Sequence, residues 1–226
     1  MNVRTITALI VAGFITSLST GCYATATSDP LNNSELSLAL QATQAMMNTP
    51  RLQHAARNTS ASSQAILSME QLLVERRPTD KEQPEKRLAD VYSYDYSVDE
   101  TVHAVVDVAT GEIISSERLK QQHLPLTVNE IARARQLVFA NAEQSALIKQ
   151  EYKRITGSEL TNPDSLNIKA FSFSADSLPE RLNAASQQCG VQRCAQVLLY
   201  THDDIVFEVS PIVNLSVGLV TQTIGF

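Results

Sequence analysis

Cys189 and Cys194 bound the stretch CGVQRC and are the residues best spaced for covalent chemistry in this sequence. In an oxidising compartment two such neighbours form a disulfide, whereas a redox pair or a metal site would be the functional alternatives. Redox motifs usually separate their cysteines by two residues, and no histidine lies within several residues to complete a set of metal ligands. The spacing therefore predicts a structural disulfide that pins a turn.

Two acidic pairs, Asp99-Glu100 and Asp203-Asp204, could hold a metal ion or act as general acid and base. Each lies at an expected hairpin turn, where aspartate is common because its side chain hydrogen-bonds the nearby backbone. The histidines at positions 54, 103, 123 and 202 stand singly, and no nucleophile elbow, zinc-protease motif or phosphate loop occurs. We interpret these residues as turn, surface or packed residues, so the sequence predicts no catalytic residue, no metal site and no cofactor.

Tyr92, Tyr94 and Tyr96 alternate along the run from 91 to 96, which places them on one face of an expected strand. Two readings stay open for this row. The rings could pack in the core, or they could form an exposed aromatic platform, because tyrosine buries a large ring while its hydroxyl stays wet. The three tyrosines are the possible interaction surface.

Residues 1–21 have the layout of a secretory signal, with a lone Arg4 followed by the apolar run from Ile6 to Leu18. That run is shorter than the roughly 20 apolar residues of a dependable membrane span. The following Leu18-Ser19-Thr20-Gly21-Cys22 resembles a bacterial lipobox, with Cys22 as the lipidated residue. The small-x-small sequence Ala24-Thr25-Ala26 offers ordinary signal cleavage instead. We expect export to the periplasmic side of the envelope, as a membrane-anchored lipoprotein or otherwise as a soluble secreted protein.

The bulk composition allows a buried core and argues against nucleic acid as a partner. The chain has 226 residues, 43% of them hydrophobic, and a formal net charge of −6. Phosphate binding needs lysine and arginine clustered on a basic face, which this balance does not favour. The residues that remain after the signal are enough for one large domain or two small ones.

One phrase occurs twice, as VVDVATGEII from Val105 and as IVNLSVGLVT from Ile212. Its Asp or Asn can start a turn, and its Gly supplies the positive φ of a short bulged hairpin, so each copy predicts two strands of a meander. The periodicity also predicts helices that begin near residue 33, at the capping box Thr127–Glu130, at Asn141, and at Ser177 with an end at Cys189-Gly190.

Both halves of the chain show the order helix, three strands, hairpin glycine, strand. We expect an α+β fold of two tandem units, each a curved antiparallel sheet of about four strands with helices on one face. The expected boundaries are a tether at 22–33, a first unit at 34–122 and a second unit at 123–226.

The segment VHAVVDVATGEIISSERL, followed by HLPLTVNEIARARQLVFANAEQSALIKQEYKRITG, resembles the small amino-terminal domains of copper amine oxidases. The matching residues are Val105, Val106, Asp107, Gly111, Pro125, Leu126, Thr127 and Glu130. The resemblance implies two cystatin-like units side by side. The large catalytic sandwich and the His-x-His pair that would bind copper are missing from the sequence, so it implies a fold without amine oxidase chemistry.

The sequence thus predicts a non-catalytic envelope protein that binds another envelope protein or assists an exported enzyme. The alternative is a periplasmic module for a small ligand or a metal ion, held between sheet and helix or between the units.

Overall fold

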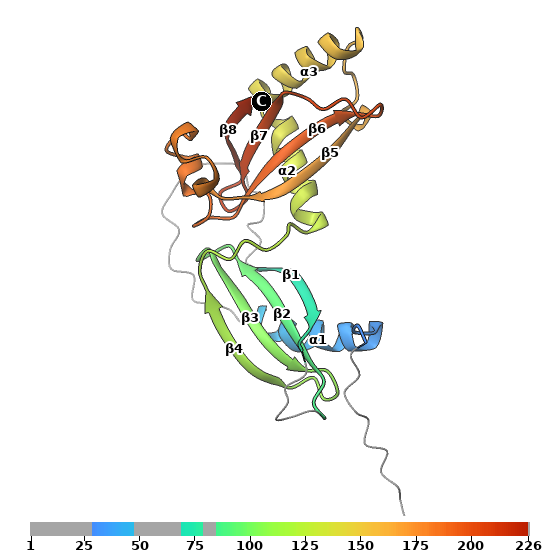
Figure 1. Cartoon of the computed structure of the whole chain (residues 1–226), viewed down its shortest axis with the longest axis vertical. Helices are drawn as coiled ribbons and strands as arrows, with labels where there is room; N and C mark the ends of the chain where they lie inside the picture. Colours follow the sequence, from blue (N-terminus) through green and yellow to red (C-terminus); the bar gives the residue numbers. More distant parts are fainter. Residues whose placement is uncertain (1–28, 48–68, 79–84, 226) are drawn as a thin grey trace, which may run out of the picture.

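The computed structural model describes residues 29–47, 69–78 and 85–225, which form two α+β units placed end to end (Figure 1). The first unit contains one helix and a sheet of strand order β1-β2-β3-β4. Its elements are α1 (Asn33–Met47), β1 (Met69–Arg76), β2 (Leu88–Asp95), β3 (Glu100–Asp107) and β4 (Ile113–Leu119). The second unit has the order β5-β6-β7-β8. Its elements are α2 (Val128–Ala140), α3 (Ala142–Thr156), β5 (Leu166–Phe173), β6 (Cys194–Thr201), β7 (Val209–Asn214) and β8 (Leu219–Gly225).

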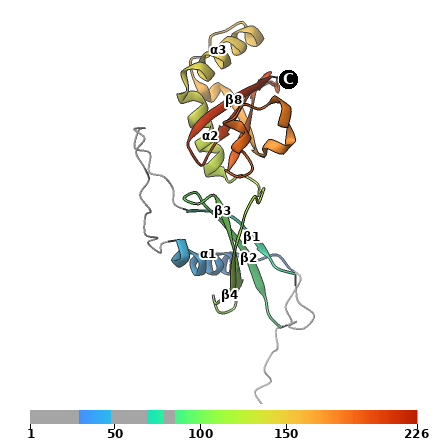
Figure 2. The same cartoon turned by 90° about the vertical axis from the view of Figure 1, so that its left-hand side faces the viewer.

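All neighbouring strands in the described residues pair antiparallel, which confirms the predicted α+β class. In the first unit α1 crosses one face of the sheet (Figure 2). Side chains alternate along a strand, so the face of β2 and β3 toward α1 carries Ala89, Val91 and Val106, which are fully or almost fully buried against Ala39. No helix of the described residues covers the opposite face of this sheet.

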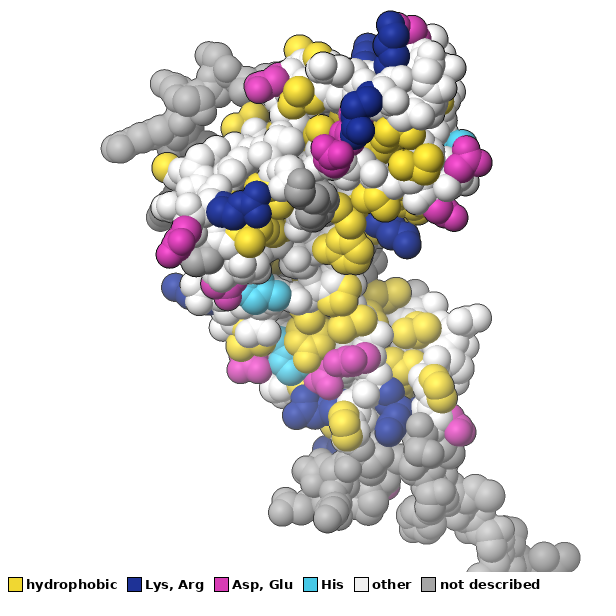
Figure 3. All heavy atoms as spheres, turned by 45° about the horizontal axis from the view of Figure 1, so that its top comes forward, with side chains coloured by type: hydrophobic (Ala, Val, Ile, Leu, Met, Phe, Trp, Pro, Cys, Tyr) yellow, Lys and Arg dark blue, Asp and Glu magenta, His cyan; other side chains and the backbone are white. Residues whose placement is uncertain are grey.

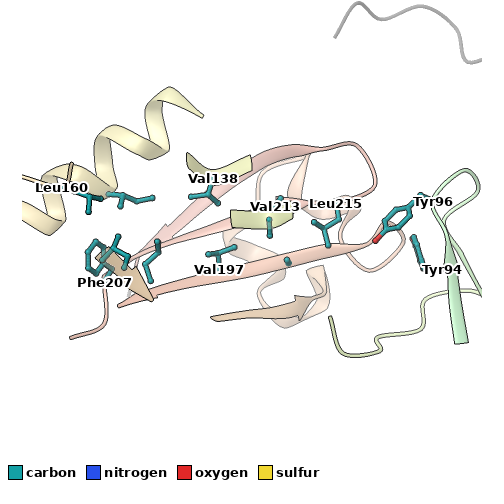
Figure 4. Packing of buried hydrophobic residues seen from close by; sticks show 13 residues of the cluster. Tyr94, Tyr96, Val138, Leu160, Val197, Phe207, Val213 and Leu215 are labelled. Carbon is teal, nitrogen blue, oxygen red and sulfur yellow. The ribbon is translucent and has the colours of Figure 1, made fainter. Parts of the chain in front are cut away.

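The core of the second unit lies between its sheet and the helices α2 and α3. It contains Val138, Ile148, Val197, Phe207 and Val213, each with at most 1% of its surface exposed. Figure 4 shows this core running without a break to Tyr94 and Tyr96, which belong to the first unit. The core of the second unit therefore extends across the junction to two tyrosines of the first unit, whose own core under α1 is a separate cluster.

The predicted helix boundaries of α2 and α3 are confirmed. Thr127 and Glu130 satisfy each other's backbone amides in a capping box, and Asn141 caps α3 by accepting from the amide of Gln144. Gly157 ends α3.

The repeated phrase forms the same bulged hairpin in both units. Asp107 and Asn214 each accept a hydrogen bond from the backbone N–H two residues on, at 2.8 and 3.0 Å. Gly111 and Gly218 follow with φ of 76° and 72° and donate back to the carbonyls of Asp107 and Asn214. The strand register shifts by one residue just before each turn. The prediction of a turn with a bulge is confirmed in both copies.

The helix predicted from Ser177 to Cys189 is wrong. This segment forms separate 3-10 turns, at Pro179–Arg181 and Ser186–Gln188, after an extended Leu178. The physical reason lies in its partners, because the amides of Asn183 donate to the Gln222 side chain and to the Thr221 carbonyl of β8, so this residue starts a separate turn in place of continuing one helix. The segment covers one end of the second sheet, where Leu182 and Cys189 pack on Phe173.

The Cys189–Cys194 disulfide is confirmed. It joins this covering segment to the first residue of β6. Among the described residues, no helix is both long and apolar enough to cross a membrane. Cys22 and the expected signal lie outside the described residues.

Substitution of either hairpin glycine by alanine tests the role of the repeated phrase. Both positions need a left-handed backbone, which costs an alanine about 1 to 2 kcal/mol. Gly111→Ala should lose more stability than Gly218→Ala, because its new Cβ would lie 3.2 Å from Leu38, whereas Gly218 has no neighbouring atom within 4 Å. Urea denaturation of both variants measures the difference, and equal losses would contradict the contact with Leu38.

Candidate functional site

A buried ion pair closes the second unit. Arg193, the residue before β6, donates from Nε and Nη2 to the two carboxylate oxygens of Glu130, the third residue of α2, with the Nη2 bond at 2.9 Å. Its guanidinium also donates to the carbonyls of Leu124 and Pro125. The two charged side chains are only 2% and 0% exposed. The pair therefore fixes the start of α2 to the start of the second strand of the unit.

The first unit contains the same pair at the same place in its fold. Arg87, the residue before β2, donates to both carboxylate oxygens of Glu35 at 2.6 and 3.0 Å, and to the carbonyls of Asp29 and Pro30. Glu35 also accepts from the backbone of Asn32, as Glu130 does from Thr127. Here the side chains are 16% and 17% exposed. The duplication thus extends to a buried electrostatic interaction.

The tyrosine row explains the difference in exposure, because its end covers the pair of the second unit. Tyr96 donates to Glu130 at 2.7 Å, and the guanidinium of Arg193 lies 5.7 Å from the ring centre of Tyr94. The two rings meet edge to face and are 7% and 5% exposed. Tyr94 and Tyr96 therefore lie inside the molecule, at the junction of the units, and are not an exposed platform.

A second group of charges surrounds this junction. Glu70 of β1 accepts from Thr127 and from Arg133 of α2, and Arg133 also donates to the hydroxyl of Tyr96. An acidic and aromatic end of the first sheet thus meets a basic end of the second unit.

The electrostatics of the junction favour charged forms. Burial raises the pKa of Glu130, but the hydrogen bonds and charge of Arg193 outweigh it, so the pKa lies below its ordinary value. The pKa of the Arg193 guanidinium is raised, because Glu130 opposes the effect of burial. Burial and the Glu130 charge raise the pKa of the Tyr96 hydroxyl. The junction therefore contains a fixed ion pair and neutral tyrosines.

Tyr92 lies apart from the other two tyrosines, on the open face of the first sheet. Its ring stacks on His103 at 4.5 Å between ring centres. The two ring nitrogens of His103 lie 2.7 Å from an Asp90 oxygen and 3.0 Å from a Glu117 oxygen, and Arg77 pairs with Asp90. This group is a charge cluster in which a histidine lies between two carboxylates.

The corresponding face of the second sheet mixes apolar side chains with Lys169 and Gln196. Phe171 of β5 is 53% exposed, and Leu198 and Tyr200 of β6, further along the same face, are half-buried. Beyond β6, the turn 202–206 is exposed at every residue, with Ile205 at 48% and Val206 at 57%. We call Tyr200 and this turn the free end of the second unit. In Figure 3, hydrophobic side chains gather on this unit and acidic side chains and a histidine lie at its margin.

The acidic pairs occupy turns, as the sequence predicted. Asp99 accepts from the Tyr94 hydroxyl, and Glu100 pairs with Arg118. Asp203 and Asp204 lie in the exposed turn, where no described residue donates to their carboxylates. Within the described residues no group of three metal-ligating side chains is assembled.

Two small cavities lie where the ligand-binding alternative would need room. One is between α1 and the first sheet, beside Thr43, Ser93 and Val102, and the other is at the junction, beside Tyr94 and His123. Each holds about 10 Å³, which is room for a single water molecule. Neither cavity therefore has room for an organic ligand.

Sequence reasoning missed the role of Arg193 and saw Glu130 only as a capping residue. A signal was present, because an arginine stands directly before the second strand of both units and a glutamate stands three residues after each helix-starting Asn32 or Thr127. The exposed Phe171 and the stacking of His103 on Tyr92 leave no comparable trace in a single sequence.

Replacement of Arg193 by methionine tests the buried pair against its less buried counterpart. Arg193→Met leaves the Glu130 charge without its cation in the interior, which costs about 3 to 5 kcal/mol. Arg87→Met should cost clearly less, because water reaches Glu35. Chemical denaturation of both variants gives the comparison, and an equal loss would show that cover by the tyrosines adds nothing.

The pH dependence of stability should also reflect the buried ion pair. The pKa of Glu130 is lower in the folded state than in the unfolded state, where it is about 4.3. Its contribution to the free energy of unfolding is therefore complete above about pH 4.3 and is lost as the pH falls from there through the folded pKa. Glu130→Gln should therefore lower stability at neutral pH and flatten the loss between neutral and acid pH. Denaturation midpoints at several pH values measure it, and an unchanged slope would refute the contribution of Glu130.

The comparisons with known proteins support the fold and show no function. No family model matches the chain, and no curated protein matches it. Among solved structures, the chain is similar to a copper-containing benzylamine oxidase from Hansenula polymorpha, at 13% identity and a TM-score of 0.52, over 88% of this chain and 30% of the oxidase. The chain spans under a third of that enzyme's length. The described units therefore have a fold that is also found within a copper amine oxidase.

Proposed function

We propose that the protein is a non-catalytic, exported envelope protein that binds another protein through its second unit. The observation that carries the proposal is that the second unit leaves large apolar side chains in solvent, with Phe171 on the open face of the sheet and Ile205 and Val206 in the turn after β6, each about half exposed. Large apolar side chains that gather on a surface mark interaction sites more often than chance exposure. The cavities of the described residues are too small for the alternative of a small organic ligand.

The scaffold supports a binding role over a catalytic one. The buried charges of the junction are paired with one another, and His103 lies between two carboxylates. The similarity to an oxidase covers 30% of that enzyme and concerns the fold alone. An accessory role beside an exported enzyme is the form of binding that we favour.

Amine-reactive crosslinking in intact envelopes tests the proposed function. A discrete adduct that contains this chain and a second protein, and that is absent from cells lacking the chain, is the expected result. The control is a variant with Phe171→Ser and Val206→Ser. Its adduct should weaken because the partner loses apolar contacts. Both positions are about half exposed, so we expect the variant to fold. If no adduct forms with any protein at any crosslinker length, the proposed function is wrong.

Lipid attachment at Cys22 is a separate part of the proposal. Labelling with radioactive palmitate should mark the protein, and Cys22→Ala should abolish the label and release the protein from membranes. Cys189→Ala with Cys194→Ala is the matched control, because those cysteines form the disulfide and should leave the label unchanged. A Cys22→Ala protein that stays with the membrane fraction would contradict the anchor.

A further inference from the structure

The register of the two sheets shows that the free end of the second unit corresponds to the end of the first unit that is buried in the junction. Met69, the first residue of β1, lies opposite Asp95, the last of β2, and Leu166 likewise lies opposite Thr201. Tyr94 and Tyr200 therefore occupy the same position, each one residue before the end of its strand. The first unit uses this end to bind the second unit, while the second unit leaves its own uncovered.

The two ends also share their chemistry. In the junction, Arg193 lies over the ring of Tyr94, and Arg133 lies 5.1 Å from the ring centre of Tyr96. Carboxylates of the first unit accept from these side chains or lie beside them. At the free end, Tyr200 has a cation over its ring, that of Lys169 at 5.6 Å, and the carboxylates of Asp203 and Asp204 have no cation among the described residues. The ring of Tyr200 is therefore already occupied by a lysine, whereas the acidic turn beside it can still accept an arginine or lysine.

The exposed side chains of the free end make an uncovered version of the junction. Tyr94 and Tyr96 are nearly inaccessible, whereas Ile205 and Val206 are about half exposed. Aromatic and aliphatic side chains beside unpaired carboxylates match the pattern of protein interfaces, in which an apolar centre is bordered by charges that select the partner. The acidic border fits a basic partner.

We infer that the free end docks a partner protein whose arginine or lysine pairs with the Asp203-Asp204 turn beside Tyr200, as Arg133 of the second unit pairs with Glu70 beside Tyr96 at the junction. This inference rests on the proposed function and adds the site and the chemistry of the partner. The partner buries Ile205 and Val206, and its cation pairs with the turn.

A second copy of this chain is a poorer occupant. The surface that receives the tyrosines in the second unit is already covered by its own first unit. The corresponding surface of the first unit has Leu38 at the place of Arg133, counted from Glu35 and Glu130, and its Arg87 is bonded to Glu35 and to two backbone carbonyls. It therefore lacks the additional arginine that the junction uses.

Site-specific photo-crosslinking in intact envelopes tests the inference. A benzoylphenylalanine residue at Val206 should give one discrete adduct, and the same residue at Ile114 of β4, which is 45% exposed, should not. The double variant Asp203→Lys with Asp204→Lys should reduce the adduct about tenfold, because like charges then face each other. Mass spectrometry should place the crosslink within a few residues of a lysine or arginine in the partner.

Each remaining outcome overturns the inference. An adduct that is equal at Val206 and Ile114, that survives the charge reversal, or that maps to an apolar or acidic segment would remove the cationic partner. An adduct with this same chain would replace the partner by a second copy. If amine-reactive crosslinking finds a partner but photo-crosslinking from position 206 does not, the free end is the wrong site and the proposed function still stands. Circular dichroism of the charge-reversal variant shows that it is folded, which its exposed positions lead us to expect.

Discussion

The bidentate arginine–glutamate pair between the helix start and the second strand is the interaction on which this structure depends. In each unit one carboxylate serves three purposes, because it caps its helix, binds the arginine before the second strand, and thereby holds helix and sheet in one relative position. A lone buried carboxylate would be strongly unfavourable, so the arginine and the two backbone carbonyls that it reaches have to be in place together. In the second unit the Cys189–Cys194 bridge ends one residue after Arg193, which restricts the loop that delivers the guanidinium. The pair, the cap and the disulfide therefore act on the same few residues.

The tandem arrangement follows from how completely that pair is covered. In the first unit, Arg87 and Glu35 keep about a sixth of their side-chain surface exposed, and in the second unit Tyr94 and Tyr96 of the neighbouring sheet close the same pair off from water. The hydroxyl of Tyr96 donates a further hydrogen bond to Glu130, while the rings of Tyr94 and Tyr96 exclude water from the pair. Such a contact extends the core of the second unit onto the first sheet, which supplies buried area that a single four-stranded sheet and helix would lack.

Sequence patterns predicted the parts of this fold that depend on local rules. The alternation of β2, the capping box at Thr127 and the two hairpin glycines are short-range signals, and each marks its element correctly. The segment after Ser177 failed for the opposite reason. Its capping pattern is a valid local signal, but hydrogen bonds to β8 and a disulfide to β6 stabilise an extended course more than an isolated helical turn would. The tyrosines were ambiguous because alternation shows which side chains share a face and not what lies against that face.

The divergence of the two open faces indicates where selection has separated the units after duplication. Asp90 and Tyr92 of the first sheet stand where Gln196 and Leu198 stand in the second, counted from the matching ends of β2 and β6. The first face has become a charge cluster that satisfies itself, with His103 held between two carboxylates, and such a surface gains little from a partner. The second face has lost those charges and exposes Phe171 beside Leu198. If both units only supported the fold, there would be no physical reason for one of them to keep apolar side chains in water, since polar residues there would be neutral for stability and better for solubility. If the protein binds a partner as proposed, the asymmetry places the contact on the second unit, with the first unit as its support.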